Sequence, residues 1–524
     1  MKFPLILRVT LSICFSIITP LLKAEVKQAD VIVYGGTAGG VMAGIAATKQ
    51  GASVLVLEPG NHVGGMLSSG LGRTDMDRQQ HVIGGLSLEF FQRVGAHYGK
   101  GAGWMFEPHV AEKVMNAMLA EHDVTVLFGK SLDSVVKENG RIRSLKTTDG
   151  DDYVANVFID ASYEGDLMAK AGVSYTFGRE GRERYEESLA GRREILRGKH
   201  QLNHKISPFK DGKLLPHITA EEDLAPVGAA DGKIQSYCFR LCLTDVPENR
   251  IPIEKPEGYD PDRYELLRRC FEVDGEKVVG SLGIKKMPNG KSDVNSGWGI
   301  SLNLLGANQD YPDATPERRK EIWDEHMSWT HGMVYYLQND PSVPENTRKF
   351  YREWGLCKDE FTDNGGWPHQ LYIREARRML GEHVLTQHDL MTQHRKYDCI
   401  GIAGYNIDIR EVQWVALRTF YFPNVTDEVY MEGYLSHPVE PWDIPYRAML
   451  PRYSECQNLL VPVCISASTI AYASFRMEPQ YMIAGQSAGV AAAIASEKVI
   501  PVHRVPIDAL QEALIHEGQI IKLP

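Results

Sequence analysis

A glycine-rich turn near the N-terminus has the residue types that hold a phosphate group, and an acidic residue follows it. Six residues form this turn: Gly35, Gly36, Thr37, Ala38, Gly39 and Gly40. The strand-forming run VIVY precedes the turn, a small-residue run follows it, and Glu58 ends the next apolar run, SVLVLE. Glycines permit a tight turn, the N–H groups of a helix N-terminus bind a pyrophosphate, and a carboxylate accepts hydrogen bonds from ribose hydroxyls. The pattern predicts a β-turn-α-β unit that binds a dinucleotide.

The turn departs at one position from the usual G-x-G-x-x-G spacing. Thr37 takes the place of the second glycine, which normally keeps side chains away from the pyrophosphate. A threonine puts a hydroxyl and a methyl group there. Taken alone, this departure weakens the prediction of a dinucleotide site.

Three further stretches have the residue types expected beside such a ligand. VGGMLSSGLG contains Gly64, Gly65 and Met66, and so many glycines indicate a backbone that another group approaches closely. The apolar run YVANVFID ends at Asp160. The alanine-rich run Met482–Ser496, MIAGQSAGVAAAIAS, predicts a helix that packs closely against a backbone or a cofactor.

These stretches lie towards the two ends of the chain, and this placement predicts the domain organisation. Residues 27–180 and 452–500 are expected to form one discontinuous Rossmann-like domain. Residues 181–451 are expected to form an inserted α+β domain that binds the substrate, and residues 501–524 a C-terminal tail. A chain of 524 residues is long enough for two or three domains with full-sized cores.

The charge and the motifs exclude several classes of function. A formal charge of −11 argues against nucleic acid or an anionic membrane surface as a partner, because both favour basic patches. The sequence has no Cys-x-x-Cys, no His-Glu-x-x-His and no phosphate-binding GxxxxGK[ST] motif. We therefore expect no metal centre, and the zinc-protease and nucleotidase interpretations lose their main support.

The first 24 residues have the pattern of a secretory signal peptide. Lys2 and Arg8 give a positive start, Val9–Leu22 is largely apolar, and Ala24 is the expected last residue removed. The apolar run is short and Pro20 interrupts it, which favours a cleaved signal over an uncleaved N-terminal anchor. We expect an exported protein, periplasmic or secreted, with no stable membrane span after cleavage.

Export would permit disulfides. The cysteines after residue 24 are Cys238, Cys242, Cys270, Cys357, Cys399, Cys456 and Cys464. Their odd number leaves at least one thiol free. Cys238 and Cys242 are too far apart along one expected strand for an easy bridge, so we expect small buried apolar residues at these positions.

Six motifs, in this order, resemble the FAD-dependent oxidoreductases with a glutathione-reductase-like fold, specifically a mostly bacterial, often secreted subfamily of uncertain substrate. They are VIVYGGTAGGVMAGIAA with Glu58, VGGMLSSGLG, FIDASYEGDLMAKAGVSYTFGRE, WGLCKDEFTDNGGWPHQLYIREARRM, IPYRAMLPR and CISASTIAYASFRMEPQYMIAGQSAGVAAA. The resemblance extends from about Ala29 to Ala495. It implies FAD as the cofactor, an α/β fold whose FAD domain has three layers (ββα), and threonine as a common variant at the position of Thr37.

The resemblance also implies where FAD lies. Residues 35–40 with Glu58 would hold the pyrophosphate and the ribose, residues 64–72 would line the flavin ring or the ribityl chain, and Asp160 would lie nearby. His62 is a further candidate for contact or covalent attachment. The helix with GQSAG would direct its N-terminus at the flavin, where its dipole stabilises negative charge on the reduced ring. The residues concerned are Gly485, Gln486, Ser487 and Ala488.

Four residues are candidates for catalysis. Arg476, just before this helix, could bind an anionic or polar substrate or stabilise reduced flavin, and the alternative is an ion pair with Glu478 or another acid. Arg374 in YIREARRM is a similar case, with an ion-paired helix as the alternative. Oxidation of a C–H bond that bears a hydroxyl needs a base for the hydroxyl proton. His369 and His437, in loops of the inserted domain, could serve as that base or be structural.

The resulting hypothesis is an FAD-dependent oxidoreductase that moves a hydride between a small organic substrate and flavin N5. Export suggests a sugar-like or other polyol C–OH as the donor, and the sequence does not identify the electron acceptor. One alternative is a flavin-dependent reductase of an activated double bond. Another is a non-catalytic binding protein that FAD stabilises.

Overall fold

The computed structural model describes residues 25–76, 79–196, 200–202, 206–277, 282–297, 299–392, 394–421 and 423–523. The expected signal peptide, residues 1–24, lies outside the described residues. Within the ranges given, no helix combines the length and the apolar character needed to cross a membrane.

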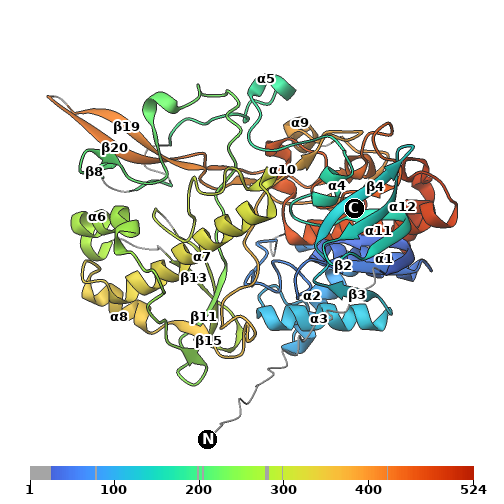
Figure 1. Ribbon diagram of the computed structural model, residues 1–524, viewed down its shortest axis with the longest axis horizontal. Coiled ribbons are helices and arrows are strands. Elements are labelled where there is room, and N and C mark those ends of the chain that lie inside the picture. The colour runs from blue at the N-terminus through green and yellow to red at the C-terminus, as the bar shows by residue number, and fades with distance from the viewer. Residues whose placement is uncertain are drawn as a thin grey trace, which may run out of the picture.

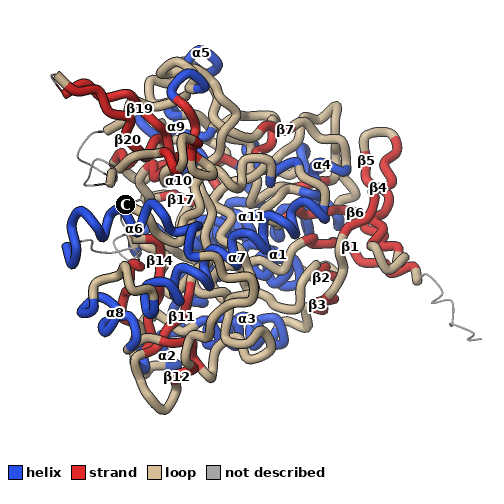
Figure 2. The backbone as a smooth tube through the Cα atoms, turned by 60° about the vertical axis from the view of Figure 1, so that its left-hand side comes forward, coloured by secondary structure: helices blue, strands red, loops and turns tan. Residues whose placement is uncertain are grey.

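One seven-stranded sheet has the order β3-β2-β1-β6-β5-β4, with β23 also paired to β6. Its strands are β1 (Val26–Tyr34), β2 (Val54–Glu58), β3 (Thr125–Phe128), β4 (Leu132–Glu138), β5 (Arg141–Thr147), β6 (Asp152–Asp160) and β23 (Leu459–Leu460). Strands β3, β2, β1, β6 and β23 are parallel, whereas β4 and β5 form an antiparallel hairpin that continues onto β6. Figure 2 shows this hairpin at the outer edge of the sheet. The Rossmann-like parallel strands confirm the expected α/β fold.

The pairing of β6 with β23 joins two distant segments of the sequence in this sheet. Phe158 and Ile159 of β6 lie opposite Leu459 and Leu460. All four side chains are buried, so the contact belongs to the core. A sheet begun near the N-terminus is thus completed near the C-terminus. The expected domain boundaries, near residues 180 and 451, stay predictions.

Two helices, α1 (Ala38–Lys49) and α11 (Glu478–Glu497), pack against this sheet and against each other. Figure 1 shows them side by side, although they come from opposite ends of the chain. A Cβ atom on Gly485 would lie 2.0 Å from the Gly39 carbonyl oxygen, and one on Gly489 would lie 2.2 Å from that of Ala43. Glycine is therefore required at both positions for the helices to approach this closely. Further helices of this part are α2 (Gly85–His97), α3 (Pro108–Glu121), α4 (Asp166–Lys170), α10 (Thr469–Phe475) and α12 (Ile507–His516).

Helix α11 begins earlier than the sequence suggested. The helix was expected over Met482–Ser496, but its first residue is Glu478, and Pro479 follows in the first turn. Proline suits this place because the first N–H groups of a helix have no partner within it. Gly485 therefore lies two turns inside the helix.

The middle of the chain forms separate sheets and the longest helix. A five-stranded antiparallel sheet has the order β12-β15-β11-β14-β13, and a three-stranded sheet has the order β10-β19-β20. Their bounds are β10 (Ile218–Ala220), β11 (Leu241–Thr244), β12 (Arg250–Ile251), β13 (Leu282–Lys286), β14 (Lys291–Ser296), β15 (Gly355–Cys357), β19 (Gln413–Tyr421) and β20 (Asn424–Glu432). The helices are α6 (Glu265–Asp274), α7 (Pro316–Asn339) and α8 (Glu345–Arg352). Thr315 caps α7 through a 3.3 Å bond from the Arg318 N–H.

Segment YIREARRM is not helical, so the alternative that Arg374 belongs to an ion-paired helix is wrong. Tyr372 forms an isolated β-bridge with Cys238, whose carbonyl accepts the Tyr372 N–H at 2.9 Å. Arg374 lies at a bend, and the short strand β16 (Arg378–Met379) follows.

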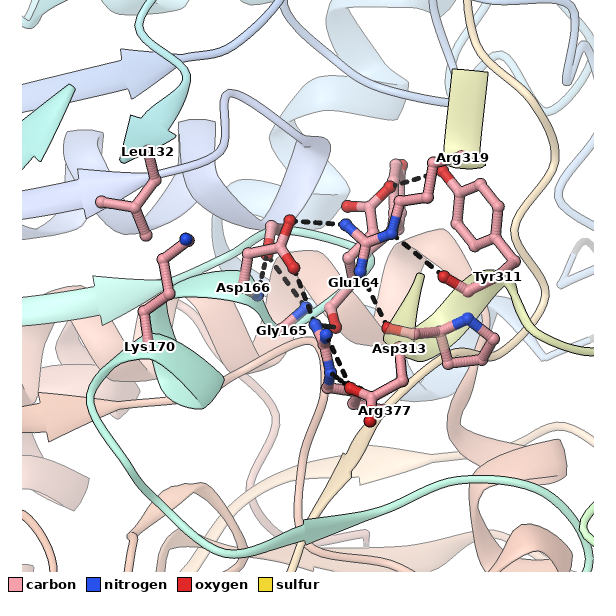
Figure 3. A network of polar contacts seen from close by, with 12 residues as sticks. Leu132, Glu164, Gly165, Asp166, Lys170, Tyr311, Asp313, Arg319 and Arg377 are labelled. Carbon is pink, nitrogen blue, oxygen red and sulfur yellow. Dashed lines mark hydrogen bonds and ion pairs between the residues drawn. The ribbon is translucent and has the colours of Figure 1, made fainter. Parts of the chain in front are cut away.

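A polar network joins the turn around α4 to the middle of the chain (Figure 3). Asp166 accepts hydrogen bonds at 2.7 Å from both Arg319 of α7 and Arg377. Arg377 also contacts Asp313 at 2.9 Å, and the Tyr311 hydroxyl donates to Glu164 at 3.1 Å. Burial raises the pKa of Glu164, whereas the two arginines hold the pKa of Asp166 below its ordinary value in spite of burial. The network fixes the middle segment against the sheet that both chain ends build.

Candidate cofactor cleft and substrate site

The Thr37 side chain forms hydrogen bonds within the protein, which explains how the turn accommodates it. Its hydroxyl donates to the Ala161 carbonyl at 2.8 Å and accepts the Gly40 N–H at 3.2 Å. Thr37 is thus the N-cap of α1. The amides of Ala38 and Gly39 lie in the first turn, whose N–H groups have no partner within the helix and can bind a phosphate.

Glu58 points back at the same turn. Its Oε2 accepts the Gly36 N–H at 2.7 Å, and its Oε1 accepts the Gly60 N–H at 2.6 Å. Burial raises the pKa of this carboxyl to about 7, although both amide bonds favour the ionised form. The carboxylate therefore has a fixed position beside the turn, where a ribose hydroxyl could share its oxygens.

The loop with Gly64, Gly65 and Met66 lies directly beside the turn. The Gly64 N–H donates to the Gly36 carbonyl at 2.7 Å. Gly65 has φ +54°, and a Cβ atom there would lie 2.2 Å from the Tyr163 hydroxyl oxygen. That hydroxyl accepts the Met66 N–H at 3.0 Å. Gly65 is therefore needed for the close approach to Tyr163, which the sequence does not indicate.

Glu478, the first residue of α11, completes this contact. The Tyr163 hydroxyl donates to its Oε1 at 2.7 Å. Its Oε2 is buried and has no hydrogen-bond partner among the described residues. Burial raises the pKa of the carboxyl to about 8, so it is largely protonated at neutral pH. The N-terminus of α11 is thus tied to the loop at Met66.

A cleft of about 320 Å³ opens at the N-terminus of α1. Three of the predicted cofactor residues line this cleft: Thr37, Glu58 and Gly65. From the middle of the chain it is lined by Trp323, Asp363, Asn364, His369 and Gln370. The free amides, the carboxylate and the close-packed glycines fit the pyrophosphate and ribose of FAD. The cleft lies between two segments that are far apart in the sequence.

Asp160 organises the turn that follows β6. Its Oδ1 accepts the Ser162 N–H at 3.1 Å and the Ser162 hydroxyl at 2.6 Å, and its Oδ2 accepts the Met168 N–H at 2.7 Å. Burial raises its pKa to about 6. The next residue, Ala161, is the one that accepts the Thr37 hydroxyl. Asp160 therefore shapes the wall behind the turn, and direct contact with a cofactor stays a prediction.

The GQSAG residues have packing contacts of their own. Gln486 Oε1 accepts the Leu86 N–H at 2.9 Å, and the Ser487 hydroxyl donates to the Ile483 carbonyl at 2.9 Å. Ala488 is fully buried. These letters also spell Gly-x-Ser-x-Gly, but Ser487 lies inside α11 and not at a strand-to-helix turn, so no nucleophile elbow is formed. Their role as cofactor contacts stays a prediction.

Arg374 and Arg476 meet at one tyrosine. The guanidinium of Arg374 lies 4.6 Å from the centroid of the Tyr372 ring, and Arg476 Nη1 donates to the Tyr372 hydroxyl at 3.4 Å. Arg476 is ion-paired with Asp408 at 3.0 Å, so the alternative of an ion pair is confirmed, with Asp408 and not Glu478 as the acid. No sequence motif indicates Asp408, which lies on β18 (Ile407–Ile409).

Arg374 itself lacks an acidic partner. It donates to the Ser236 carbonyl and, at 3.3 Å, to Cys238 Sγ, and no described carboxylate lies within 4.0 Å of it. Only 2% of the residue is exposed. Burial and the neighbouring charges of Arg410 and Arg476 lower the pKa of its guanidinium. A buried cation without a counter-charge is a place where an anionic or oxygen-rich ligand is favoured.

The two candidate histidines lie in different surroundings. His437 ends β21 (Leu435–His437) and pairs with Ile407, next to Asp408. His369 lines the cofactor cleft and stacks on His62. The structure therefore brings Arg374 and Arg476 together, with the strand of His437 close by. It places His369 with Thr37 and Glu58 instead.

One group of side chains in the described part of the chain has donor atoms close enough for a metal ion: Glu107, His109 and Glu360. Lys291 Nζ lies 2.7 Å from Glu107 Oε1 and 2.7 Å from Glu360 Oε1. Its ammonium group thus provides the positive charge between the carboxylates. We interpret the group as an ion-pair cluster.

Comparison with known proteins identifies the family of the chain. Residues 30–514 match the model of the family described as FAD dependent oxidoreductase. The chain belongs to this family. FAD is accordingly its cofactor, and the protein is an FAD-dependent oxidoreductase. No curated protein matches the sequence.

Solved structures show more distant likenesses. A geranylgeranyl bacteriochlorophyll reductase-like protein from Thermoplasma acidophilum is 12% identical, with a TM-score of 0.34 over 94% of this chain and 85% of that one. A flavoprotein/dehydrogenase from Cytophaga hutchinsonii is 18% identical, with a TM-score of 0.22 over 28% of this chain and 42% of that one. A flavin-containing monooxygenase from Stenotrophomonas maltophilia is 19% identical, with a TM-score of 0.20 over 30% and 43%. The last two likenesses span less than half of the solved chains.

Proposed function

We propose that this FAD-dependent oxidoreductase oxidises a C–OH group of a small sugar-like or polyol substrate that carries a carboxylate or another oxygen-rich group. FAD, when bound, accepts the hydride at N5. The observation that carries the proposal is Arg374, a buried guanidinium that has no acidic partner among the described residues and lies beside Arg476 and Tyr372. In this proposal Arg374 and Arg476 bind the substrate oxygens and orient the reacting carbon.

The hydroxyl proton must leave as the hydride leaves, so a base is needed beside the arginines. Two carboxylates contact arginines that lie near Arg374: Asp408 contacts Arg476, and Glu411 contacts Arg410. Asp408 has 21% of its side chain exposed and Glu411 has 7%. We assign the proton to Asp408, because the more accessible carboxylate can reach a substrate without displacing a buried group.

An anaerobic assay isolates the half-reaction in which the substrate loses a hydride and a proton and FAD gains two electrons. The purified holoprotein is mixed with glycerol and D-glucose, and in parallel with glycerate and D-glucuronate, and the flavin absorbance is followed. We expect the carboxylates to bleach the flavin and the neutral alcohols to do so far more slowly. Arg374→Met should slow bleaching by about 100-fold or more, the scale of a lost charge-assisted contact in a buried site.

A matched control is Arg318→Met, since Arg318 lies on the exposed surface of α7 and pairs only with exposed acids. It should bleach as the unchanged protein does. Bleaching only by artificial reductants, with turnover of enoates, would support the reductase alternative. Bound flavin that none of these compounds reduces would support the non-catalytic alternative.

We also propose that the protein is exported and belongs to the secreted part of its family. The support is the charged and apolar pattern of residues 1–24. N-terminal sequencing of the protein from its native host should begin at Glu25, and fractionation should recover it outside the cytoplasm. A mature chain that retains residues 1–24 would contradict the cleavage.

A further inference from the structure

Two histidines from distant segments meet in the cofactor cleft. The ring centroids of His62 and His369 are 3.9 Å apart and the rings are nearly parallel, at 15°. Both line the cleft with Thr37, Glu58 and Gly65. Because His369 comes from the middle of the chain, the pair connects that segment to the FAD-binding turn.

His62 is held between two carboxylates. Its Nδ1 lies 3.0 Å from Glu112 Oε1, and its Nε2 lies 2.9 Å from Asp363 Oδ2. A ring with a carboxylate at each nitrogen donates at both and carries a positive charge. The Glu112 hydrogen bond raises the pKa of His62, against partial burial. A cation therefore lies on one side of the cleft.

His369 has the opposite character. Both of its ring nitrogens are buried, and neither has a hydrogen-bond partner among the described residues. Burial and the charge of His62 lower its pKa to about 3, so the ring is neutral, with one N–H donor and one acceptor unused. Buried polar atoms normally have partners, so an unused pair on a ring that lines a cleft indicates a missing ligand.

The position of the pair points to the part of FAD concerned. His62 lies two residues before Gly64, whose N–H donates to Gly36, and Gly64 forms a β-bridge with Thr37. These are the residues of the turn at the N-terminus of α1. The histidines are thus beside the place where the pyrophosphate is bound, and not at the arginines around Tyr372.

We propose that His369 donates a hydrogen bond to the FAD diphosphate, that His62 orients it and adds positive charge, and that the middle segment thereby completes the cofactor site. His369 is in this case a cofactor ligand and not the general base. The inference rests on FAD as the cofactor and is independent of the substrate proposed above.

The test is a set of binding titrations of apoprotein, without turnover. FAD, ADP and riboflavin are the probes, and the dissociation constants are measured by calorimetry. His369→Phe keeps a flat ring on His62 but removes both nitrogens. We expect it to weaken FAD and ADP binding by about tenfold or more, the value of one hydrogen bond to a charged group, and to leave riboflavin binding unchanged.

The matched control is His516→Phe, an exposed histidine at the end of α12, which should bind all three probes as the unchanged protein does. Equal affinity of His369→Phe and the unchanged protein for FAD and ADP, within twofold, would overturn the proposal. So would flavin that stays attached to His369 after acid denaturation, because the ring would then serve as a covalent anchor.

If His369→Phe does not fold, the unchanged protein still decides the question. Titration of ¹⁵N-histidine-labelled apoprotein with ADP should shift the signals of two histidines, and His62→Gln should remove one of them. Histidine signals that do not respond to ADP would refute the proposal.

Discussion

Substitution of Gly485 by alanine tests whether the two chain ends are joined by glycine contacts. The new Cβ atom would lie 2.0 Å from the Gly39 carbonyl oxygen and 2.9 Å from the Gly39 Cα. Both partners are backbone atoms, so no side chain can move aside. Ordinary contact, at 3.4 Å or more, requires the Cβ atom and the carbonyl oxygen to separate by about 1.4 Å.

The expected cost follows from two opposing effects. Overpacking costs about 1–3 kcal/mol, and alanine gains about 1 kcal/mol over glycine in a helix interior. Because the clash is between backbones, we place the cost at the upper end and expect a net loss of about 2 kcal/mol in the free energy of unfolding. FAD affinity should fall as well, since Gly39 lies in the first turn of α1.

Urea unfolding followed by circular dichroism measures this loss. Gly101→Ala is the control, because a Cβ atom on Gly101 meets no atom within 4 Å, and it should change stability by less than about 0.5 kcal/mol. If Gly485→Ala is as stable as the control and binds FAD equally well, the close packing of α1 on α11 is not what these glycines provide.

Three further predictions concern single side chains. Folding raises the Glu478 pKa from 4.5 to about 8, so the apoprotein should lose stability as the pH rises from 4.5 to 8, and Glu478→Gln should flatten this part of a stability-against-pH curve measured by urea unfolding. Thr37→Val removes the cap of α1 and should cost about 1 kcal/mol in urea unfolding and weaken FAD binding in titrations, whereas an unchanged affinity would contradict the capping role. Asp166→Asn deprives Arg319 and Arg377 of a shared partner and should lower the free energy of unfolding by about 2 kcal/mol, a value between those of surface and buried ion pairs. An unaltered thermal midpoint would show that the network is not needed for stability.

The parts of the site that lie close together in the sequence could be predicted from it. Glycines between a strand-forming run and a small-residue run specify the turn locally, and Glu58 follows from the length of one βαβ unit. Even the departure at Thr37 has a local explanation, since threonine caps helices. The Ala161 carbonyl that accepts its hydroxyl is more than a hundred residues away, and nothing in the sequence indicates it.

The parts that depend on distant contacts were missed or misread. YIREARRM has residues that favour helix, yet no helix forms there, because Tyr372 pairs with Cys238 and Arg378–Met379 form β16. The sequence indicates Arg374 as a candidate but not the residues around it, and it does not indicate Asp408. His369 was expected as a base because of its residue type, whereas its stacking on His62 depends on how two loops fold against each other.

The glycines of α11 show why the sequence and the structure answer different questions. Their composition indicates close approach, but it does not say whether the neighbour is a cofactor or another helix. In the structure the neighbour is α1, the helix that presents the pyrophosphate turn. In the FAD site that we propose, residues near 40 and near 370 contact the cofactor, and residues near 485 hold α1 in place. A ligand that binds only this folded arrangement stabilises all three segments at once, by about 2.7 kcal/mol at a concentration 100 times its dissociation constant. The proposal therefore gives FAD a structural role as well as a chemical one, because its binding energy would favour the association of the two chain ends with the middle segment.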